Sequence, residues 1–184
     1  MGKISEVISE VLISEEEIVA KCKELGARIS KDYEGKRPIL IGLLSGAVPF
    51  LAELIKHITC EMEIEFIDVS SYSGASSTGK VVIEKDIIAD LSGRNILFIE
   101  DIIDTGLTLD YVIENFKKRN VKSIEICTLV DKPEGRKINT VNPKYIGFYI
   151  PNKFVVGFGL DYNELYRNFP YIGVLKEEVY QKDK

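Results

Sequence analysis

Short apolar runs that end in turns recur along the chain. Residues 39–44 (ILIGLL), 96–99 (ILFI) and 123–130 (SIEICTLV) are rich in β-branched side chains, as strands buried on both faces of a parallel sheet are. In residues 61–69, apolar and acidic side chains alternate, which predicts a half-buried strand. The pattern therefore predicts a central sheet whose strands are mostly parallel.

Segments of helical periodicity alternate with these strands. Ser14 and Glu17 form a capping-box pattern. An apolar stripe at helical spacing follows it: Ile18, Cys22, Leu25 and Ile29. Helices are also predicted over about 48–56 and from about 105–107 onward. Because strands alternate with helices, we expect an α/β fold with a twisted, mostly parallel sheet and helices on both faces.

Residues 95–110 (NILFIEDIIDTGLTLD) join a strand, a turn and the start of a helix. Glu100 and Asp101 end the strand, Asp104 follows, and the turn continues through Thr105, Gly106, Leu107 and Thr108. Free amides at a helix start, together with the Thr hydroxyls, can bind a phosphate. Carboxylates beside a phosphate repel it unless they bind sugar hydroxyls, a divalent cation or a proton. The stretch therefore indicates a phosphorylated sugar with a metal.

Two other predicted strands end in candidate ligand-binding turns. Ser45 and Gly46 follow residues 39–44 and precede a helix, so their amides form a second potential anion site. Lys132 follows residues 123–130, at the edge where ligands bind in open α/β sheets. Taken alone, each turn fits an ordinary loop as well.

Residues 70–80 (SSYSGASSTGK) have the composition of a loop, and strand character resumes at 81–83. A linker is one interpretation of this loop. A loop of this length between strands of a compact domain is more often a mobile lid over a site. Two further strands are predicted at 145–149 and 154–158, ahead of a short polar tail.

Composition disfavours several classes of protein. The 184 residues carry a net charge of −5 with a pI of about 5.1, and Lys and Arg are scattered, which disfavours nucleic acid or an anionic membrane as the main partner. Cys22, Cys60 and Cys127 lack metal-ligand spacing, so we expect reduced thiols in a cytoplasmic protein. No signal peptide is evident near the N-terminus, and no apolar run is long enough to span a bilayer.

Residues 100–106 (EDIIDTG) resemble the phosphoribosyl-pyrophosphate motif of type I phosphoribosyltransferases, in the form used by the hypoxanthine (guanine) phosphoribosyltransferase family. Residues 153–164 (KFVVGFGLDYNE) closely match the second signature of that family. The likeness extends from about residue 18 to residue 180. It implies a single domain over residues 1–184, with a small hood formed by about residues 145–184 and the N-terminal segment.

The resemblance implies roles for the acidic motif. The 5′-phosphate would be held by Asp104, Thr105, Gly106, Leu107 and Thr108. Glu100 and Asp101 would orient the ribose hydroxyls and ligate Mg²⁺. Asp104 would also be catalytic, because it would exchange a proton with N7 of the purine.

The resemblance also implies a purine site. Lys132 would donate a hydrogen bond to the exocyclic oxygen of a 6-oxopurine. Phe154 would stack on the base, and the backbone of Val155 would read its edge. Asp161 would border the purine and ligate a magnesium ion that also holds pyrophosphate.

Pyrophosphate would be bound by the amides of Ser45 and Gly46 and by the side chain of Arg167. The family usually carries Lys at the position of Ser45, so this chain lacks one cation there. In the family the peptide bond before this residue is commonly cis. We therefore expect a cis, or mixed cis and trans, peptide bond between Leu44 and Ser45.

The implied reaction transfers a 5-phosphoribosyl group from phosphoribosyl pyrophosphate to N9 of hypoxanthine or guanine, in purine salvage. The loop at 70–80 would close over the reacting centre and carries a Ser-Tyr pair, here Ser71 and Tyr72. A homodimer or homotetramer is implied as well. Two alternatives stay open: an enzyme of the same group that acts on xanthine or a pyrimidine, and an RNA-binding regulator on the same fold, which the acidic pI disfavours.

Overall fold

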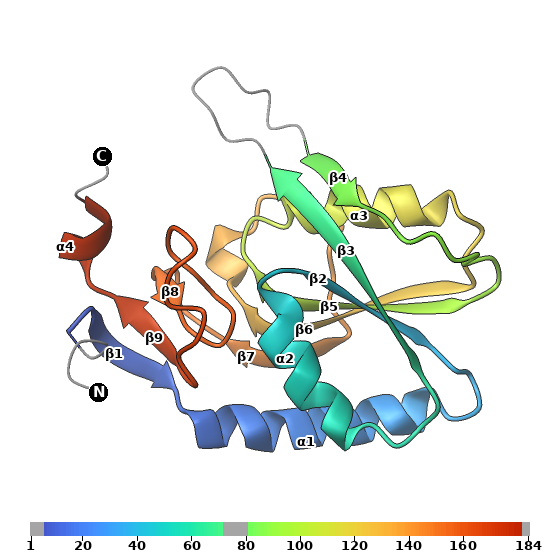
Figure 1. The fold of residues 1–184 in the computed structure, drawn as a ribbon, viewed down its shortest axis with the longest axis horizontal. Helices are drawn as coiled ribbons and strands as arrows, with labels where there is room; N and C mark the ends of the chain where they lie inside the picture. The colour runs from blue at the N-terminus through green and yellow to red at the C-terminus, as the bar shows by residue number, and fades with distance from the viewer. Residues whose placement is uncertain (1–5, 72–80, 182–184) are drawn as a thin grey trace.

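A six-stranded sheet forms the larger part of the molecule (Figure 1). The computed structural model describes residues 6–71 and 81–181. In spatial order the strands are β4 (Val81–Lys85), β3 (Glu63–Ser71), β2 (Ile39–Leu44), β5 (Asn95–Ile103), β6 (Ser123–Asp131) and β7 (Tyr145–Tyr149). Neighbouring strands are parallel except for β3 and β4. The predicted α/β fold with a mostly parallel sheet is confirmed.

Helices cover both faces of this sheet, as the alternation of strands and helices predicted. On one face lie α1 (Glu15–Asp32), α2 (Ala47–Leu54) and the short η1 (Ile55–His57); α3 (Leu107–Lys117) lies on the other, and the short η2 (Pro133–Gly135) follows β6. Within β5, Leu97 belongs to the core with α1 and α2, whereas its neighbour Phe98 packs edge-on against Phe116 of α3 at 4.9 Å. Alternate side chains of β5 thus enter two cores, which is why the strand reads as an unbroken apolar run.

The capping box predicted for the first helix is present. The Glu17 amide donates to Ser14 Oγ at 3.2 Å, and the Ser14 amide donates to Glu17 Oε2 at 2.8 Å. These two bonds satisfy amides that a helix start would otherwise leave free. They fix the point at which the chain leaves β1 and enters α1.

A second, antiparallel sheet lies at one end of the molecule (Figure 1). We call it the hood sheet; it consists of β1 (Ile8–Ile13), β9 (Ile172–Leu175) and β8 (Val155–Val156), in that order. The short helix α4 (Glu177–Tyr180) follows β9. Since β7 pairs with β6, it belongs to the six-stranded sheet, and the hood sheet draws only on later residues and on β1.

The strand expected at 154–158 is wrong in its length, because only Val155–Val156 form β8. The next three residues adopt positive φ angles, 100° at Gly157, 48° at Phe158 and 103° at Gly159, which no strand can contain. The chain turns there instead. The neighbouring strand β9 was not predicted at all.

Several further expectations meet the structure here. Cys22, Cys60 and Cys127 are free thiols. Within residues 6–71 and 81–181, no helix has the length and apolar character required to cross a membrane. The predicted lid at 70–80 begins as the last residues of β3, Ser70 and Ser71, while Tyr72 and residues 73–80 lie outside the described part of the chain.

Candidate active site

The carboxyl ends of β2, β5 and β6 meet at one edge of the six-stranded sheet. This edge carries the predicted site residues of the sheet: Ser45, Gly46, Glu100, Asp101, Asp104 and Lys132. The turns after the strands join them there because parallel strands present the same end to the same edge. The segment after β8 brings Asp161 and Arg167 to the same place, where they line one cavity with Ser45 and Gly46.

The turn after β5 opens into a cavity of about 140 Å³, which we call the α3 cavity. Asp104, Thr105, Gly106 and Thr108 are among its lining residues. Gly106 caps α3 with a φ of 82°, a left-handed conformation that suits glycine, and Leu107 is the first residue of the helix. The structure therefore sets the N-terminus of α3 against a small cavity, which is an arrangement suited to a phosphate.

Glu100 and Asp101 place two carboxyl groups side by side at the end of β5. Glu100 is only 9% exposed, and burial, together with the charge of Asp101, raises its pKa well above the usual range. Burial also raises the pKa of Asp101 to about 6, although the Ile102 amide, which donates to its Oδ1 at 2.8 Å, and the Arg167 charge oppose this rise. Both carboxyl groups are thus poised to gain from a nearby cation.

The turn after β2 packs directly on Asp101. A Cβ atom at Gly46 would lie 1.8 Å from Asp101 Oδ2, so only glycine fits at this point. The peptide bond between Leu44 and Ser45 is cis, as the resemblance implied. A cavity of about 400 Å³, which we call the β2 cavity, is lined by Ser45, Gly46 and Asp101.

Arg167 lines the β2 cavity and is its one cation among the described residues. Its Nη1 lies 2.9 Å from Asp161 Oδ1 and donates to the Gly159 carbonyl at 2.7 Å, and its Nη2 lies 2.9 Å from Glu164 Oε2. Its Nε is buried and has no hydrogen-bond partner in the described parts of the chain.

A third cavity, of about 230 Å³, lies at the end of β6 and is called the β6 cavity here. Its apolar wall consists of Ile102, Phe154, Val155 and Leu160, and its polar groups come from Asp101, Asp104, Lys132 and Asp161. Lys132 is only 6% exposed, and its Nζ lies 3.6 Å from Asp104 Oδ2. A flat apolar wall with a few fixed polar groups suits a heteroaromatic ligand.

Two residues that support the site escaped the sequence interpretation. Arg136 forms an ion pair with the buried Asp131 and donates to the Val141 carbonyl at 2.7 Å. The Cδ of Arg136 lies 3.2 Å from the position that a Cβ at Gly106 would take, so Arg136 and Asp131 support the turn between β5 and α3. The opposite charges of Asp131 and Arg136, directly after a central strand, were the available signal.

The cavities and charged groups at this edge of the sheet are those of a class of enzymes that bind phosphorylated sugars. The chain belongs to the phosphoribosyl transferase family, because the family model described as a phosphoribosyl transferase domain matches residues 10–163. Within that family its relatives are named hypoxanthine-guanine phosphoribosyltransferases. The protein from Streptococcus mutans is 56% identical over 176 residues, which cover 95% of this chain and 97% of the relative. The protein from Lactococcus lactis is 56% identical over 180 residues, which cover 97% of each.

A solved structure agrees with the sequence relatives. The hypoxanthine phosphoribosyltransferase from Staphylococcus aureus superposes on this chain with a TM-score of 0.93. The two chains are 49% identical, and the match covers 98% of each. The likeness therefore includes the hood sheet as well as the six-stranded sheet.

The raised pKa of Asp101 predicts a stabilising substitution in metal-free buffer. Above pH 6 the folded chain holds this carboxyl group ionised, whereas below its unfolded pKa of 3.8 the group is neutral in both states. The contribution of Asp101 to stability should therefore fall as the pH rises from about 4 to 6. Asp101→Asn should remove this loss and raise the free energy of unfolding at pH 7.5 by about 1–2 kcal/mol, with no gain at pH 4.

Denaturant unfolding in EDTA at both pH values measures this effect. Glu61→Gln is the matched control, because Glu61 is an exposed carboxylate far from the site, and it should change stability equally little at either pH. An Asp101→Asn variant that is less stable than wild type at pH 7.5 would contradict the prediction.

Proposed function

We propose that this chain transfers the 5-phosphoribosyl group from phosphoribosyl pyrophosphate to N9 of hypoxanthine or guanine, forming IMP or GMP and pyrophosphate. The observation that carries the proposal is that the α3, β6 and β2 cavities adjoin, with Ile102 lining all three. A ribose centred near Ile102 would direct its 5′-phosphate, its base and its pyrophosphate into separate cavities. The names of the relatives support the same substrates.

The leaving group would occupy the β2 cavity. As the bond from C1′ to pyrophosphate breaks, the ribose develops positive charge and the pyrophosphate gains negative charge. Arg167 and the amides of Ser45 and Gly46 would stabilise that negative charge and hold the reactants in line. The position of Arg167, the one cation that lines this cavity among the described residues, supports this role.

Glu100 and Asp101 would bind the ribose hydroxyls and share Mg²⁺ with the substrate, and Asp161 would ligate magnesium on the pyrophosphate side. No three His, Cys, Asp or Glu side chains converge on one point among the described residues. Glu100, Asp101 and Asp161 line the β2 cavity, and Mg²⁺ is typically bound by one or two carboxylates together with substrate phosphates and water. The raised pKa of Glu100 and of Asp101 also fits a site that a cation completes. When bound, the metal would neutralise charge on the pyrophosphate.

The base would occupy the β6 cavity. Phe154 would stack on it, the backbone of Val155 would read its edge, and Lys132 would donate to the 6-oxo group. Asp104 lines both the β6 and the α3 cavities, so it borders the base as well as the phosphate turn. From there its carboxylate would accept the proton of N7 as N9 attacks C1′.

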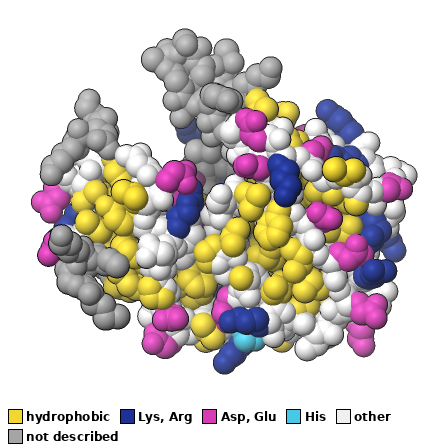
Figure 2. Space-filling view, viewed as in Figure 1, with side chains coloured by type: hydrophobic (Ala, Val, Ile, Leu, Met, Phe, Trp, Pro, Cys, Tyr) yellow, Lys and Arg dark blue, Asp and Glu magenta, His cyan; other side chains and the backbone are white. Residues whose placement is uncertain are grey.

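The wider proposal includes purine salvage in the cytoplasm, a single domain over residues 1–184, a homodimer or homotetramer, and a lid with Ser71 and Tyr72. The free thiols support a reducing compartment. On the face shown in Figure 2, Lys and Arg are interspersed with Asp and Glu, which does not favour nucleic acid as a partner.

A steady-state assay with phosphoribosyl pyrophosphate, Mg²⁺ and each base tests the proposal. Hypoxanthine or guanine should give the highest kcat/KM. A preference for xanthine would favour the first alternative. Absence of transfer to any base, combined with salt-dependent RNA binding, would favour the RNA-binding regulator.

Asp104→Asn should lower kcat by about 10²-fold or more, since it removes the proposed general base and leaves the cavities intact. The dissociation constant of IMP should change little. Asp110→Asn is the matched control on α3, because Asp110 lines none of the three cavities, and it should retain kcat. An unchanged kcat in Asp104→Asn would remove Asp104 from the chemistry.

Lys132→Ala should raise the KM for hypoxanthine by about 10- to 100-fold, because the oxo group loses a charged donor in a buried pocket. The KM for phosphoribosyl pyrophosphate should change far less. Lys137→Ala, at an exposed lysine of the same loop, should leave both KM values near wild type. Equal rises in KM for both substrates would mean that Lys132 binds phosphate or supports folding instead.

Ser45→Lys should tighten phosphoribosyl pyrophosphate several-fold, because it adds a cation to a cavity that Glu100, Asp101 and Asp161 also line. Isothermal titration at low and high salt measures the effect, which should shrink at high salt. Ser45→Gln is the control, with similar length and no charge. If Ser45→Lys binds no more tightly than Ser45→Gln at low salt, a missing cation does not limit affinity at this turn.

A further inference from the structure

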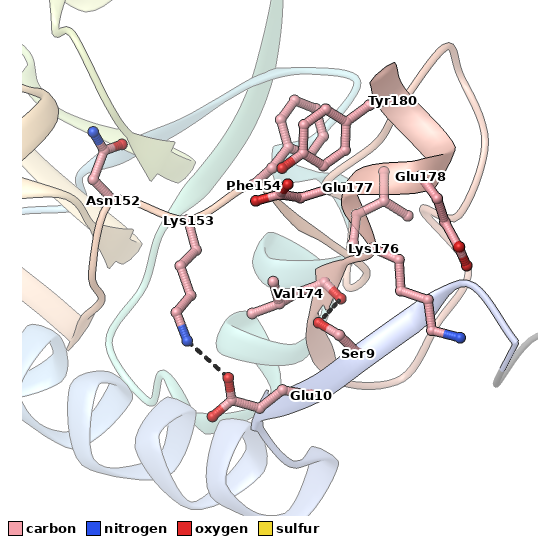
Figure 3. A pocket seen from close by; sticks show the side chains of 11 residues that line it. Ser9, Glu10, Asn152, Lys153, Phe154, Val174, Lys176, Glu177, Glu178 and Tyr180 are labelled. Carbon is pink, nitrogen blue, oxygen red and sulfur yellow. Dashed lines mark hydrogen bonds and ion pairs between the residues drawn. The ribbon is translucent and has the colours of Figure 1, made fainter. Parts of the chain in front are cut away.

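Phe154 separates two cavities. On one side is the β6 cavity, which also contains Lys132 and Asp161. On the other is a cavity of about 720 Å³ between the hood sheet and α4, called the hood cavity here and shown in Figure 3. Tyr180 lines the hood cavity and is absent from the lining of the β6 cavity. The ring of Phe154 therefore has Tyr180 behind it and the proposed base site in front of it.

The ring of Phe154 is held by two other aromatic rings. Tyr180 stacks on it with ring centroids 5.1 Å apart and an angle of 21° between the planes (Figure 3). Tyr162 meets it edge-on at 5.6 Å and 86°. Both geometries are favourable for aromatic pairs. Since Phe154 is still 40% exposed, these rings, rather than burial in a core, restrict its motion.

The backbone holds Tyr180 in position behind Phe154. The Leu175 amide at the end of β9 donates to the Phe154 carbonyl at 2.9 Å, and α4 begins two residues later. The Lys176 amide donates to the Val7 carbonyl at 2.9 Å, which joins the start of α4 to the residue that precedes β1. Tyr180 also packs against the hood core of Val156, Phe169 and Leu175.

Two polar contacts join residues that line the hood cavity. Lys153 Nζ lies 2.8 Å from Glu10 Oε2, and Ser9 Oγ donates to the Val174 carbonyl at 3.2 Å (Figure 3). These contacts join the segment that carries Phe154 to β1 and β9. Among the described residues, Phe154 is the one that lines both the hood cavity and the β6 cavity.

We propose that Tyr180 is a positioning residue for the base: its ring fixes the plane of Phe154, so that the purine stacks on a wall that is already ordered. The inference rests on the proposed function. A half-exposed phenylalanine that rotates freely would lose side-chain entropy when the base binds, and a ring ordered beforehand avoids that loss. Tyr180 lines neither the α3 cavity nor the β2 cavity, so we expect its effect to be confined to the base.

Tyr180→Ala should raise the KM for hypoxanthine by about 3- to 10-fold, the fold-change expected from loss of one aromatic pair. The KM for phosphoribosyl pyrophosphate and kcat should stay within about 2-fold of wild type. Tyr180→Phe keeps the flat face and should restore the wild-type KM for hypoxanthine. Tyr180→Leu keeps apolar contact with the hood core but lacks the flat face. It should therefore raise the KM for hypoxanthine as Tyr180→Ala does. This second variant tests the proposal even if Tyr180→Ala reduces folding.

Tyr171→Ala is the matched control. Tyr171 is also a hood aromatic in a stacked pair, with Phe169 at 5.5 Å and 30°, and it makes no ring contact with Phe154. Its loss should lower thermal stability without a selective rise in the KM for hypoxanthine. If Tyr171→Ala and Tyr180→Ala change both KM values and kcat alike, Tyr180 has only a structural role and the proposal is overturned.

A second measurement needs no turnover. The chain has no tryptophan, so Phe154→Trp places a single fluorescent indole at the wall of the β6 cavity. Adding Tyr180→Ala should lower the fluorescence anisotropy of that indole, and adding Tyr171→Ala should not. If Tyr180→Ala leaves the anisotropy of the indole unchanged, Tyr180 does not restrain the side chain at position 154, and the proposal is overturned even if the enzyme is active. A wild-type chain inactive with every base would instead overturn the proposed function, while the anisotropy still reports whether Tyr180 orders the ring.

Discussion

Two adjacent carboxyl groups at the end of β5 impose the main constraint on this site. Glu100 and Asp101 are held where burial disfavours their charge, next to cavities that suit anionic groups. Such a site can accept a polyanion only if positive groups surround the acids. The structure supplies the N-terminus of α3, the amides of the β2 turn and Arg167, and a divalent cation would add the remainder. The close contact between Asp101 and Gly46 brings these groups within reach of one ligand.

The two sheets carry different parts of the proposed site. Groups suited to phosphate and ribose lie on turns anchored in the six-stranded sheet, where β2, β5 and β6 are hydrogen-bonded to one another. Much of the apolar wall of the proposed base site comes from the segment around β8, which is carried by a sheet of short antiparallel strands. The smaller sheet buries fewer large side chains and relies on aromatic pairs and single ion pairs to keep Phe154 in place.

Sequence patterns predict the parts of the structure that depend on neighbours in the chain. The apolar run of β5, the capping box of α1 and the carboxylates before α3 are all local, and each was found where expected. The contact of Asp101 with Gly46 depends on how β2 and β5 pair, so no local pattern could reveal it. The turn after β8 was misread because Gly157 and Gly159 lie within an apolar run that resembles a strand. The support of the α3 turn by Arg136 also arises only from packing.

The pairing of β1 with β9 has a consequence for how the molecule is made. Ile8 pairs with Leu175, so the hood sheet closes a loop that contains the entire six-stranded sheet. Closing so long a loop is slow, and it has to wait until the ribosome has released the distant segment. The turns after β2 and β5 can therefore form while synthesis is still under way. The segment from Phe154 to Arg167 is synthesised after the six strands of the larger sheet, so the wall of the β6 cavity and the one cation that lines the β2 cavity among the described residues are both added last.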